Sequence, residues 1–458
     1  MSFVSWQAAV YHLKYGKSIA VMALLLLSIQ GVSAADIPAF PGAEGFGCRT
    51  PGGRGGRIIW VDNLTDSGPG SLRAACQAAG PRMVLFRIAG MIELNSVIQI
   101  KEPYLTLSGQ SAPGDGICLR GYGLSIQTHD VVLRYIRVRP GDIAGKEVDA
   151  ISIGSVSRNV VVDHCSASWA VDEILSPSGD IADVTVQWCL IAEALNHSVH
   201  SKGAHGYGSL VRAVGGISLH HNLWAHNQDR NPRLGDNYGK PPFPTLDVRN
   251  NVMYNFGNLS VIGDVLGVNY VGNYIKPGQN TPQAGGRLRP TDAADTRFFM
   301  EGNVVEGDLP ATADPRRLFS RMESNGRSLV TILKDPLPVP EVATVSAGEA
   351  LQRILEGVGA VYPRRDPLDQ RIIDDFRKGT GSIVDSQKQV GGWPVYTYQE
   401  IPADTDQDGI PDIWEKSHGL NPANPVDAQE IRSQDGYSNL EAYLNSLTLS
   451  AAKSRRRT

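Results

Sequence analysis

Four acidic residues near the middle of the chain have the spacing expected of a cation site. Asp149 opens the strand-like pattern Asp-Ala-Ile-Ser-Ile just after Glu147, and Asp172 and Glu173 end the turn of the next repeat. If each repeat is one coil of a stacked fold, Asp149 and Asp172 lie close together on one face. Carboxylates that close repel each other, so a hard cation such as Ca²⁺ is a natural partner. The alternative is that they are turn residues bonding their own backbone.

Two arginines downstream have the chemistry to bind an acidic sugar. Arg230 and Arg233 flank Pro232, whose ring stiffens the chain just after a predicted strand. The planar fork of a guanidinium matches a carboxylate, so this turn could pair with sugar carboxylates. The alternative is two solvated arginines that pair with Asp229 or Asp236.

A third group of oxygen donors recurs between residues 404 and 415 with the spacing of an EF-hand calcium loop. Positions 1, 3, 5, 9 and 12 are acidic, position 6 is glycine, and position 7 offers its backbone carbonyl. The ligands predicted in this order are Asp404, Asp406, Asp408, Asp412 and Glu415, with Ile410 at position 7. An acidic linker is the alternative, but this spacing arises rarely by chance. We expect a structural calcium clip that orders residues 404–445 and takes no part in catalysis.

The elements that position these residues repeat along the chain. A short apolar pattern recurs at steps of 22 to 33 residues, which suits one coil of a β-helix. Its fourth position is held in turn by Ile136, Cys165, Cys189, Asn222, Asn251, Asn273 and Asn303. Equal positions stack in such a fold, so the four asparagines should form a ladder of amide hydrogen bonds. The sequence therefore predicts an all-β protein, a right-handed parallel β-helix with short helical caps.

The remaining signals divide the chain into four parts. Lys14 and Lys17, an apolar run and a small-x-small site make residues 1–34 a signal peptide. We expect the β-helix in residues 35–330, a helical and irregular extension in 331–403, and the calcium module in 404–445. Within these parts, a helix at 71–80 should close the open end of the first coil, and capped helices are expected at 346–357 and 367–378. Whether the last two pack against the β-helix stays open.

Composition and charge exclude some partners. Loss of residues 1–34 would remove two lysines and no other charge, which moves the net charge from -4 to -6. A nucleic-acid binder would show a basic excess, and the one long apolar run is too short to span a bilayer. The export signal predicts a secreted or periplasmic protein, which we expect to be a monomer. A long, exposed parallel sheet suits a polymer better than a small metabolite.

Histidines and cysteines in the repeats need no catalytic role. His164, His220 and His221 lie in strand repeats and are interpreted as wall or stacking residues. Cys165 and Cys189 share one column, where free thiols and a disulfide both stay open because in-register stacking suits disulfide geometry poorly.

Five segments of the sequence together resemble the pectate lyases, the calcium-dependent parallel β-helix polysaccharide lyases that cleave galacturonan. The resemblance runs from about Ala39 to about Asn303. It is carried by the segments 39–47, 52–56, 68–73 and 160–164, and by His221-Asn222 followed by Arg230 to Arg233. It implies calcium-dependent β-elimination of unesterified polygalacturonate, giving unsaturated oligogalacturonates. A lyase on methylated pectin and a non-catalytic polysaccharide-binding β-helix are the alternatives.

The resemblance also implies roles for individual residues. Arg230 falls on the catalytic arginine of the family, Asp149 and Asp172 fall on two calcium-binding acids, and Glu147 falls near a third. The chain departs from the pattern where another acid is replaced by Ser168, so the metal site either has fewer ligands or recruits Glu173 or Glu147. The substrate-binding lysine has no match in register, and Lys202 is the nearest candidate. A second arginine is replaced by Gly235, and Arg233 could take its place.

Overall fold

The computed structural model describes residues 37–235, 241–283 and 285–455. The signal peptide predicted for residues 1–34 lies outside the described residues, as does Asp236. No helix in the described part of the chain is long and apolar enough to cross a membrane.

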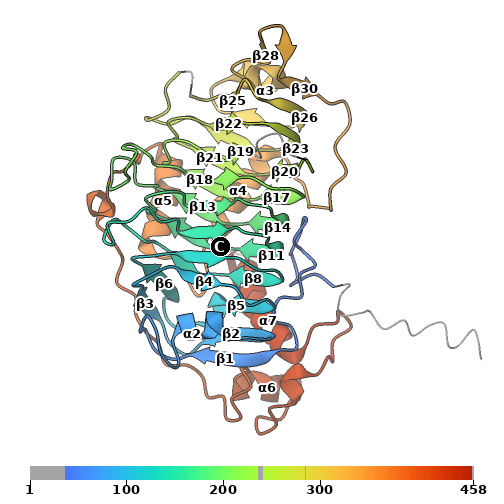
Figure 1. The fold of residues 1–458 in the computed structure, drawn as a ribbon. Helices are drawn as coiled ribbons and strands as arrows, with labels where there is room; N and C mark the ends of the chain where they lie inside the picture. Colours follow the sequence, from blue (N-terminus) through green and yellow to red (C-terminus); the bar gives the residue numbers. More distant parts are fainter. Residues whose placement is uncertain (1–36, 236–240, 284, 456–458) are drawn as a thin grey trace, which may run out of the picture.

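The main body is a stack of parallel strands wound into a β-helix, which confirms the predicted fold class (Figure 1). Each coil passes through three faces. The first face, sheet 1, has eleven strands in the order β1 (Arg57–Val61), β2 (Arg82–Phe86), β5 (Leu105–Ser108), β8 (Val131–Arg134), β11 (Arg158–Asp163), β14 (Ala182–Gln187), β17 (Ile217–His220), β20 (Thr245–Arg249), β23 (Val265–Val271), β26 (Asp295–Glu301) and β30 (Val330–Ile332).

The other two faces follow the same order of coils. Sheet 2 has nine strands: β3 (Gly90–Glu93), β6 (Ile117–Arg120), β9 (Arg137–Val138), β12 (Ser166–Ser168), β15 (Leu190–Ala192), β18 (Leu223–Ala225), β21 (Val252–Tyr254), β24 (Tyr274–Lys276) and β27 (Val304–Val305). The third face is two sheets of four strands each. They are β4 (Ile98–Ile100), β7 (Leu124–Ile126), β10 (Ile151–Ile153) and β13 (Leu175–Pro177), then β16 (Leu210–Val211), β19 (Arg233–Leu234), β22 (Ser260–Ile262) and β25 (Leu288–Pro290). A hairpin of β28 (Glu323–Ser324) and β29 (Arg327–Ser328) stands at the C-terminal end of the stack.

Alternation along each strand builds the core. In β11, Val160 and Val162 pack inside the β-helix, while Val161 between them packs outward against Phe40. Parallel register then places Val162 beside Val186 of the next coil. Repeated through the stack, this makes one continuous apolar column, and its burial is the main force that favours folding.

A two-residue corner joins sheet 1 to sheet 2, and it explains the repeated pattern. Its first residue has the left-handed backbone conformation in consecutive coils: Tyr135 (φ 56°), His164 (φ 50°), Trp188 (φ 54°), His221 (φ 57°), Asn250 (φ 51°), Gly272 (φ 61°) and Gly302 (φ 64°). The second residue is the repeated fourth position. The predicted asparagine ladder is confirmed, since Nδ2 of each asparagine donates to Oδ1 of the next: Asn222 to Asn251 at 3.1 Å, Asn251 to Asn273 at 3.1 Å and Asn273 to Asn303 at 3.0 Å.

The interpretation of the corner histidines as stacking residues is confirmed. The rings of Tyr135, His164, Trp188 and His221 form one stack, with successive centroids 4.9, 5.6 and 4.4 Å apart. His220 is fully buried beside His221. All five cysteines of the chain are free thiols, so Cys165 and Cys189 do not form a disulfide.

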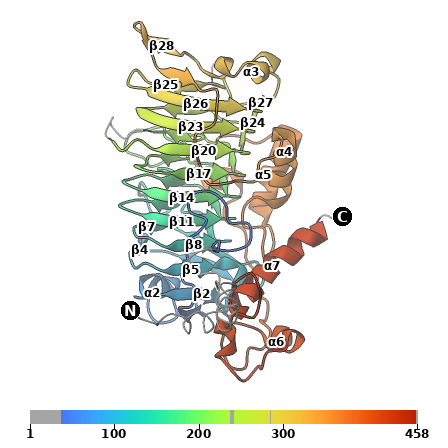
Figure 2. The ribbon, with the colours of Figure 1, turned by 90° about the vertical axis from the view of Figure 1, so that its right-hand side faces the viewer.

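Helices close the ends and cover one face. The predicted cap is α2 (Leu72–Gln77), where the hydroxyl of Ser71 accepts the N–H of Ala74, and it ends three residues before Gly80. Its buried Leu72 reaches the core of the first coils. The short α3 (Leu309–Ala313) lies at the other end of the stack (Figure 2).

The C-terminal extension packs against the β-helix, which answers the question that the sequence left open. The predicted helices are α4 (Ala347–Gly357) and α5 (Pro367–Lys378), and they cover sheet 2 with a shared apolar cluster (Figure 2). The buried Arg139 anchors them, because its guanidinium bonds Asp369 at 2.6 Å and Asp366 at 2.5 Å. The chain then returns to the first coils, where α6 (Asp412–His418) and α7 (Asn439–Arg455) lie.

Candidate active site

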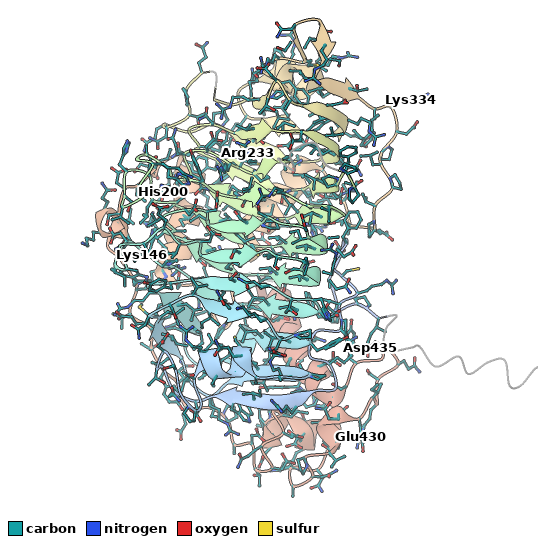
Figure 3. All side chains as sticks on the ribbon, viewed as in Figure 1. Lys146, His200, Arg233, Lys334, Glu430 and Asp435 are labelled. Carbon is teal, nitrogen blue, oxygen red and sulfur yellow. The ribbon has the colours of Figure 1, made fainter. Side chains whose placement is uncertain are left out.

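The residues predicted to do chemistry come from equivalent loops. In successive coils the loop from sheet 2 to the third face carries Asp149 before β10, Asp172 and Glu173 before β13, residues 200–207 before β16, and Arg230 before β19. A one-coil stack therefore brings together side chains that are far apart in sequence. Figure 3 shows His200 at the edge of the stack and Arg233 on its face.

The register of these loops differs by one residue from the stacking expected from sequence. Ile151 pairs with Leu175, which places Glu173, and not Asp172, beside Asp149. The column continues through Tyr207, which is bridged in parallel to both Glu173 and Asp229.

The acidic residues form a compact group. Asp149, Asp172 and Glu173 each offer a carboxylate oxygen, and these three oxygens lie within 4.8 Å of one another. The N–H of Glu173 donates to Oδ1 of Asp149 at 3.0 Å, which fixes one carboxylate against the backbone of the next coil. Burial, and then the neighbouring Asp172 carboxylate, raise the pKa of Asp149. Three oxygen ligands under mutual repulsion fit a hard divalent cation.

Arg230 faces this group from two coils away. Its Nη1 donates to Oε1 of Glu173, and its guanidinium carbon lies 4.2 Å from the ring centroid of Tyr207. Its backbone has a φ of 62°, and its N–H donates to Oδ1 of Asp229 at 2.6 Å. The side chain is 20% exposed, so the guanidinium is held in place and still reaches solvent.

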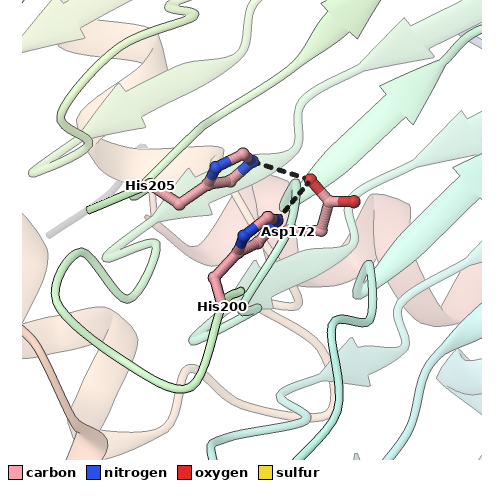
Figure 4. A group of neighbouring side chains, drawn as sticks. All are labelled: Asp172, His200 and His205. Carbon is pink, nitrogen blue, oxygen red and sulfur yellow. Dashed lines mark hydrogen bonds and ion pairs between the residues drawn. The ribbon is translucent and has the colours of Figure 1, made fainter. Parts of the chain in front are cut away.

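Two buried histidines, His200 and His205, lie beside the carboxylate of Asp172 (Figure 4). Nε2 of His205 lies 2.8 Å from Oδ1 of Asp172, and Nε2 of His200 lies 3.9 Å from the same atom. The two rings stack with centroids 3.7 Å apart. Nδ1 of His200 accepts the N–H of Lys202 at 3.1 Å, so the neutral ring carries its proton on Nε2. His200 therefore acts as a donor toward carboxylates, and burial lowers its pKa.

The other residues predicted for the site lie around this centre. Glu147 is exposed, and its Oε1 accepts the N–H of Ser201 at 2.7 Å, which ties it to the 200–207 loop. Lys202 is exposed on that loop, and Arg233 is partly exposed in β19. Ser168 is buried in β12, paired with Ala192, which belongs to the cluster under α4 and α5.

Sequence reasoning missed His200, His205 and Tyr207. Their loop is seventeen residues long, from Glu193 to Ser209, and joins β15 to β16. Two histidines and a tyrosine in the longest insertion of the repeat were the available signal. Without the fold, their distance from Asp172 in sequence gave no reason to join them.

The predicted calcium loop places its side chains unevenly. Asp404, Asp406 and Asp408 each offer an oxygen to one group within 4.8 Å, and Glu415 joins a second group through Asp408. Asp412 lies elsewhere, because its carboxylate accepts the N–H and the hydroxyl of Thr405, both at 2.8 Å. Ile410 is fully buried, and its N–H donates to Oδ1 of Asp408 at 2.9 Å.

Known proteins with similar sequences align with nearly the whole chain. A probable pectate lyase C of Emericella nidulans is 36% identical over 423 residues, which cover 91% of this chain and 94% of the relative. A probable pectate lyase C of Aspergillus terreus is 35% identical over 443 residues, which cover 94% of this chain and 99% of the relative. No protein-family model matches the chain.

A solved structure supports the fold. A pectate lyase described with its substrate specificity and anti β-elimination mechanism superposes with a TM-score of 0.50, at 13% identity, over 72% of this chain and 99% of that one. The fold and the relatives define a β-helix polysaccharide lyase. On the identity and coverage of its relatives, the chain belongs to the pectate lyases.

Proposed function

We propose that this protein cleaves unesterified polygalacturonate by β-elimination, with Ca²⁺ held by Asp149, Asp172 and Glu173. One observation carries the proposal: Arg230 reaches the acidic group from a loop two coils away and pairs with Glu173. The relatives named as pectate lyases support the substrate class. We further propose that the protein acts as a monomer outside the cytoplasm, secreted or periplasmic.

The three carboxylates suit Ca²⁺ because hard oxygen ligands converge there, and Glu147 could add an outer one. When bound, the ion would act as a Lewis acid toward the sugar carboxylate. The chain's own residues prepare this site: Asp149 is fixed by the N–H of Glu173, and Asp172 is oriented by His205.

In the reaction the proton at C5 of a galacturonate leaves, the bond from C4 to the glycosidic oxygen breaks, and a C4–C5 double bond forms. Arg230 is the side chain proposed to act at C5. Arginine normally keeps its proton, and the pairing with Glu173 favours the charged form. Arg230 must therefore separate from Glu173 and give up a proton before it can accept the proton from C5. In the alternative role it orients the substrate while water or hydroxide takes the proton.

Arg233 and Lys202 are proposed to bind neighbouring sugar carboxylates. Arg233 lies in β19, three residues after Arg230, and Lys202 lies on the exposed loop beside His200. Lys202 lies on the loop that carries His205, and Arg233 pairs with Leu210 just after that loop, so both could meet carboxylates of a bound polyanion.

The test is the ultraviolet absorbance of unsaturated products from polygalacturonate, with calcium and with a chelator. The proposal expects activity that calcium restores, and it expects highly methylated pectin to be a much poorer substrate. Activity on methylated pectin that resists chelation would favour a pectin lyase. Binding of polygalacturonate without any unsaturated product would favour a non-catalytic binding protein.

A further inference from the structure

Five carboxylates from two segments converge in the C-terminal module, far from the candidate active site. One group within 4.8 Å joins Asp404, Asp406 and Asp408, and another joins Asp408, Glu415 and Asp427. Asp408 belongs to both groups and links them. Asp427 begins the 3₁₀ turn η4 (Asp427–Gln429), twelve residues beyond the end of the predicted loop.

We propose that these five carboxylates bind one divalent cation of the calcium class, and that the ion fastens the C-terminal module onto the first coils of the β-helix. The ligand set differs from the sequence prediction because Asp427 enters and Asp412 stays outside. The site is independent of the proposed lyase function.

Buried oxygens without hydrogen bonds point to a ligand. Among the described residues, one oxygen of Asp404, Asp406, Asp408 and Asp427 and both oxygens of Glu415 are buried with no hydrogen-bond partner. Glu415 is 0% exposed, Asp427 is 1% exposed and Asp408 is 3% exposed. Buried carboxylates are normally paired or bound to a metal. Six converging oxygens match the number that Ca²⁺ takes.

The backbone already orients this set. The second oxygen of each of three aspartates is held by an N–H: Asp404 by Gly409 at 3.2 Å, Asp408 by Ile410 at 2.9 Å, and Asp427 by Asn421 at 3.0 Å. The remaining oxygen of each is left for the centre.

The loop that carries the site lies directly on the first coils. Ile410 packs in one buried cluster with Met83 and Leu85 of β2 and with Leu440 of α7. A Cβ added at Gly409 would stand 2.8 Å from Leu85, so the loop backbone lies too close to β2 for any side chain at this position.

Two further contacts tie α7 and the segment before it to the N-terminal segment. Arg54 pairs with Glu441 at 2.7 Å, and the hydroxyl of Tyr437 donates to the carbonyl of Pro38 at 3.2 Å. The same buried cluster includes Ile58 and Trp60 of β1, so an ion that joins residues 404–415 to Asp427 would hold the module against both β1 and β2 (Figures 1 and 2).

The test uses Asp427→Asn and, as a matched control, Asp412→Asn. Both variants also carry Asp149→Asn and Asp172→Asn. These two substitutions remove calcium binding at the candidate active site, so that only the C-terminal site is measured. Calcium binding to the metal-free protein is measured by calorimetry, and terbium binding is measured by luminescence excited through Trp414, the neighbour of Glu415. We expect Asp427→Asn to weaken calcium binding about tenfold or more, while Asp412→Asn changes it much less. Equal effects of the two variants would overturn the ligand set.

The second arm needs no variant of the site. Hydrogen exchange of the full chain is followed with calcium and with chelator. Calcium should slow exchange in β1 and β2 and reduce proteolysis after residue 403, and the variant with Asp149→Asn and Asp172→Asn should show the same protection. Calcium-independent exchange in β1 and β2 would overturn the fastening role. Hydrogen exchange does not depend on lyase activity. A protein without lyase activity would therefore contradict the proposed function without contradicting the C-terminal cation site.

Discussion

Arg230 and Glu173 come from loops two coils apart and meet as an ion pair beside the ring of Tyr207. Glu173 also belongs to the acidic group, and its N–H holds Asp149. One carboxylate is thus shared between the proposed catalytic cation and the proposed metal site. Any change at Glu173 should affect both.

Arg230→Lys tests the catalytic role. Lysine keeps the charge but loses the planar fork and the reach. If Arg230 is the base, turnover on polygalacturonate should fall by about 10²–10⁴, with a small change in KM. If Arg230 only orients the substrate, KM should rise while saturated turnover largely survives.

Arg233→Lys is the control for that experiment, since it makes the same replacement three residues away and should mainly affect KM. Near-wild-type kinetics of Arg230→Lys would remove Arg230 from the mechanism.

His205→Ala tests whether the histidine positions Asp172. Loss of the 2.8 Å contact should raise the calcium concentration for half-maximal activity by about 10–100-fold, because partners that orient a ligand carry that much metal affinity. Turnover at saturating calcium should change little. His205→Gln retains a nitrogen at a similar reach and should recover part of the affinity. An unchanged calcium requirement in His205→Ala would show that Asp172 needs no such support.

Asn251→Ala tests the ladder. The side chain accepts from the N–H and from Nδ2 of Asn222, and it donates to the carbonyl of Leu219 at 2.9 Å. Removing this side chain leaves buried polar groups without hydrogen-bond partners, so the free energy of unfolding should fall by about 2–5 kcal/mol.

Thermal melting of Asn251→Ala beside Asn303→Ala measures this effect. Asn303 is the half-buried last member of the ladder, so Asn303→Ala should lower the melting temperature clearly less than Asn251→Ala does. Similar melting temperatures for the two variants would mean that the ladder follows from the fold without stabilising it.

The aromatic stack makes a pH prediction. Burial lowers the pKa of His221 to about 3, below its ordinary value of about 6.5. Below pH 6.5 the unfolded chain takes up a proton that the folded chain refuses, so stability is lost as the pH falls from about 6.5 toward 3. At pH 5 the loss from His221 alone should be about 2 kcal/mol.

His221→Asn should flatten this dependence in denaturation curves at pH 7 and pH 5. Asparagine suits the backbone there, since Asn250 occupies the same corner in the next coil with a φ of 51°. Parallel pH profiles for the two proteins would show that His221 does not titrate on unfolding.

The sequence was informative wherever one residue type repeats at one structural position. The column from Ile136 to Asn303 predicted the coils because each corner repeats the same position, and its asparagines predicted the ladder because a buried amide needs a hydrogen-bond partner. The capping residues Ser346 and Asp366 predicted α4 and α5 for the same local reason.

Contacts between coils could not be predicted in the same way. The register that puts Glu173 beside Asp149 depends on the number of residues in each loop before the next strand begins. The two histidines on Asp172 come from an insertion, and Asp427 comes from beyond the calcium loop. None of these distances follows a repeat, so only the folded chain reveals them.

The contact between Tyr437 and Pro38 has a practical consequence for how the molecule can be handled. This contact sets the segment before α7 beside the first described residues, at the end of the stack that holds the first coils, and Figure 3 shows Asp435 well away from Arg233. A support coupled near the exposed Asp435 would therefore hold the enzyme by that end, with its sugar-facing loops turned to the bulk solution.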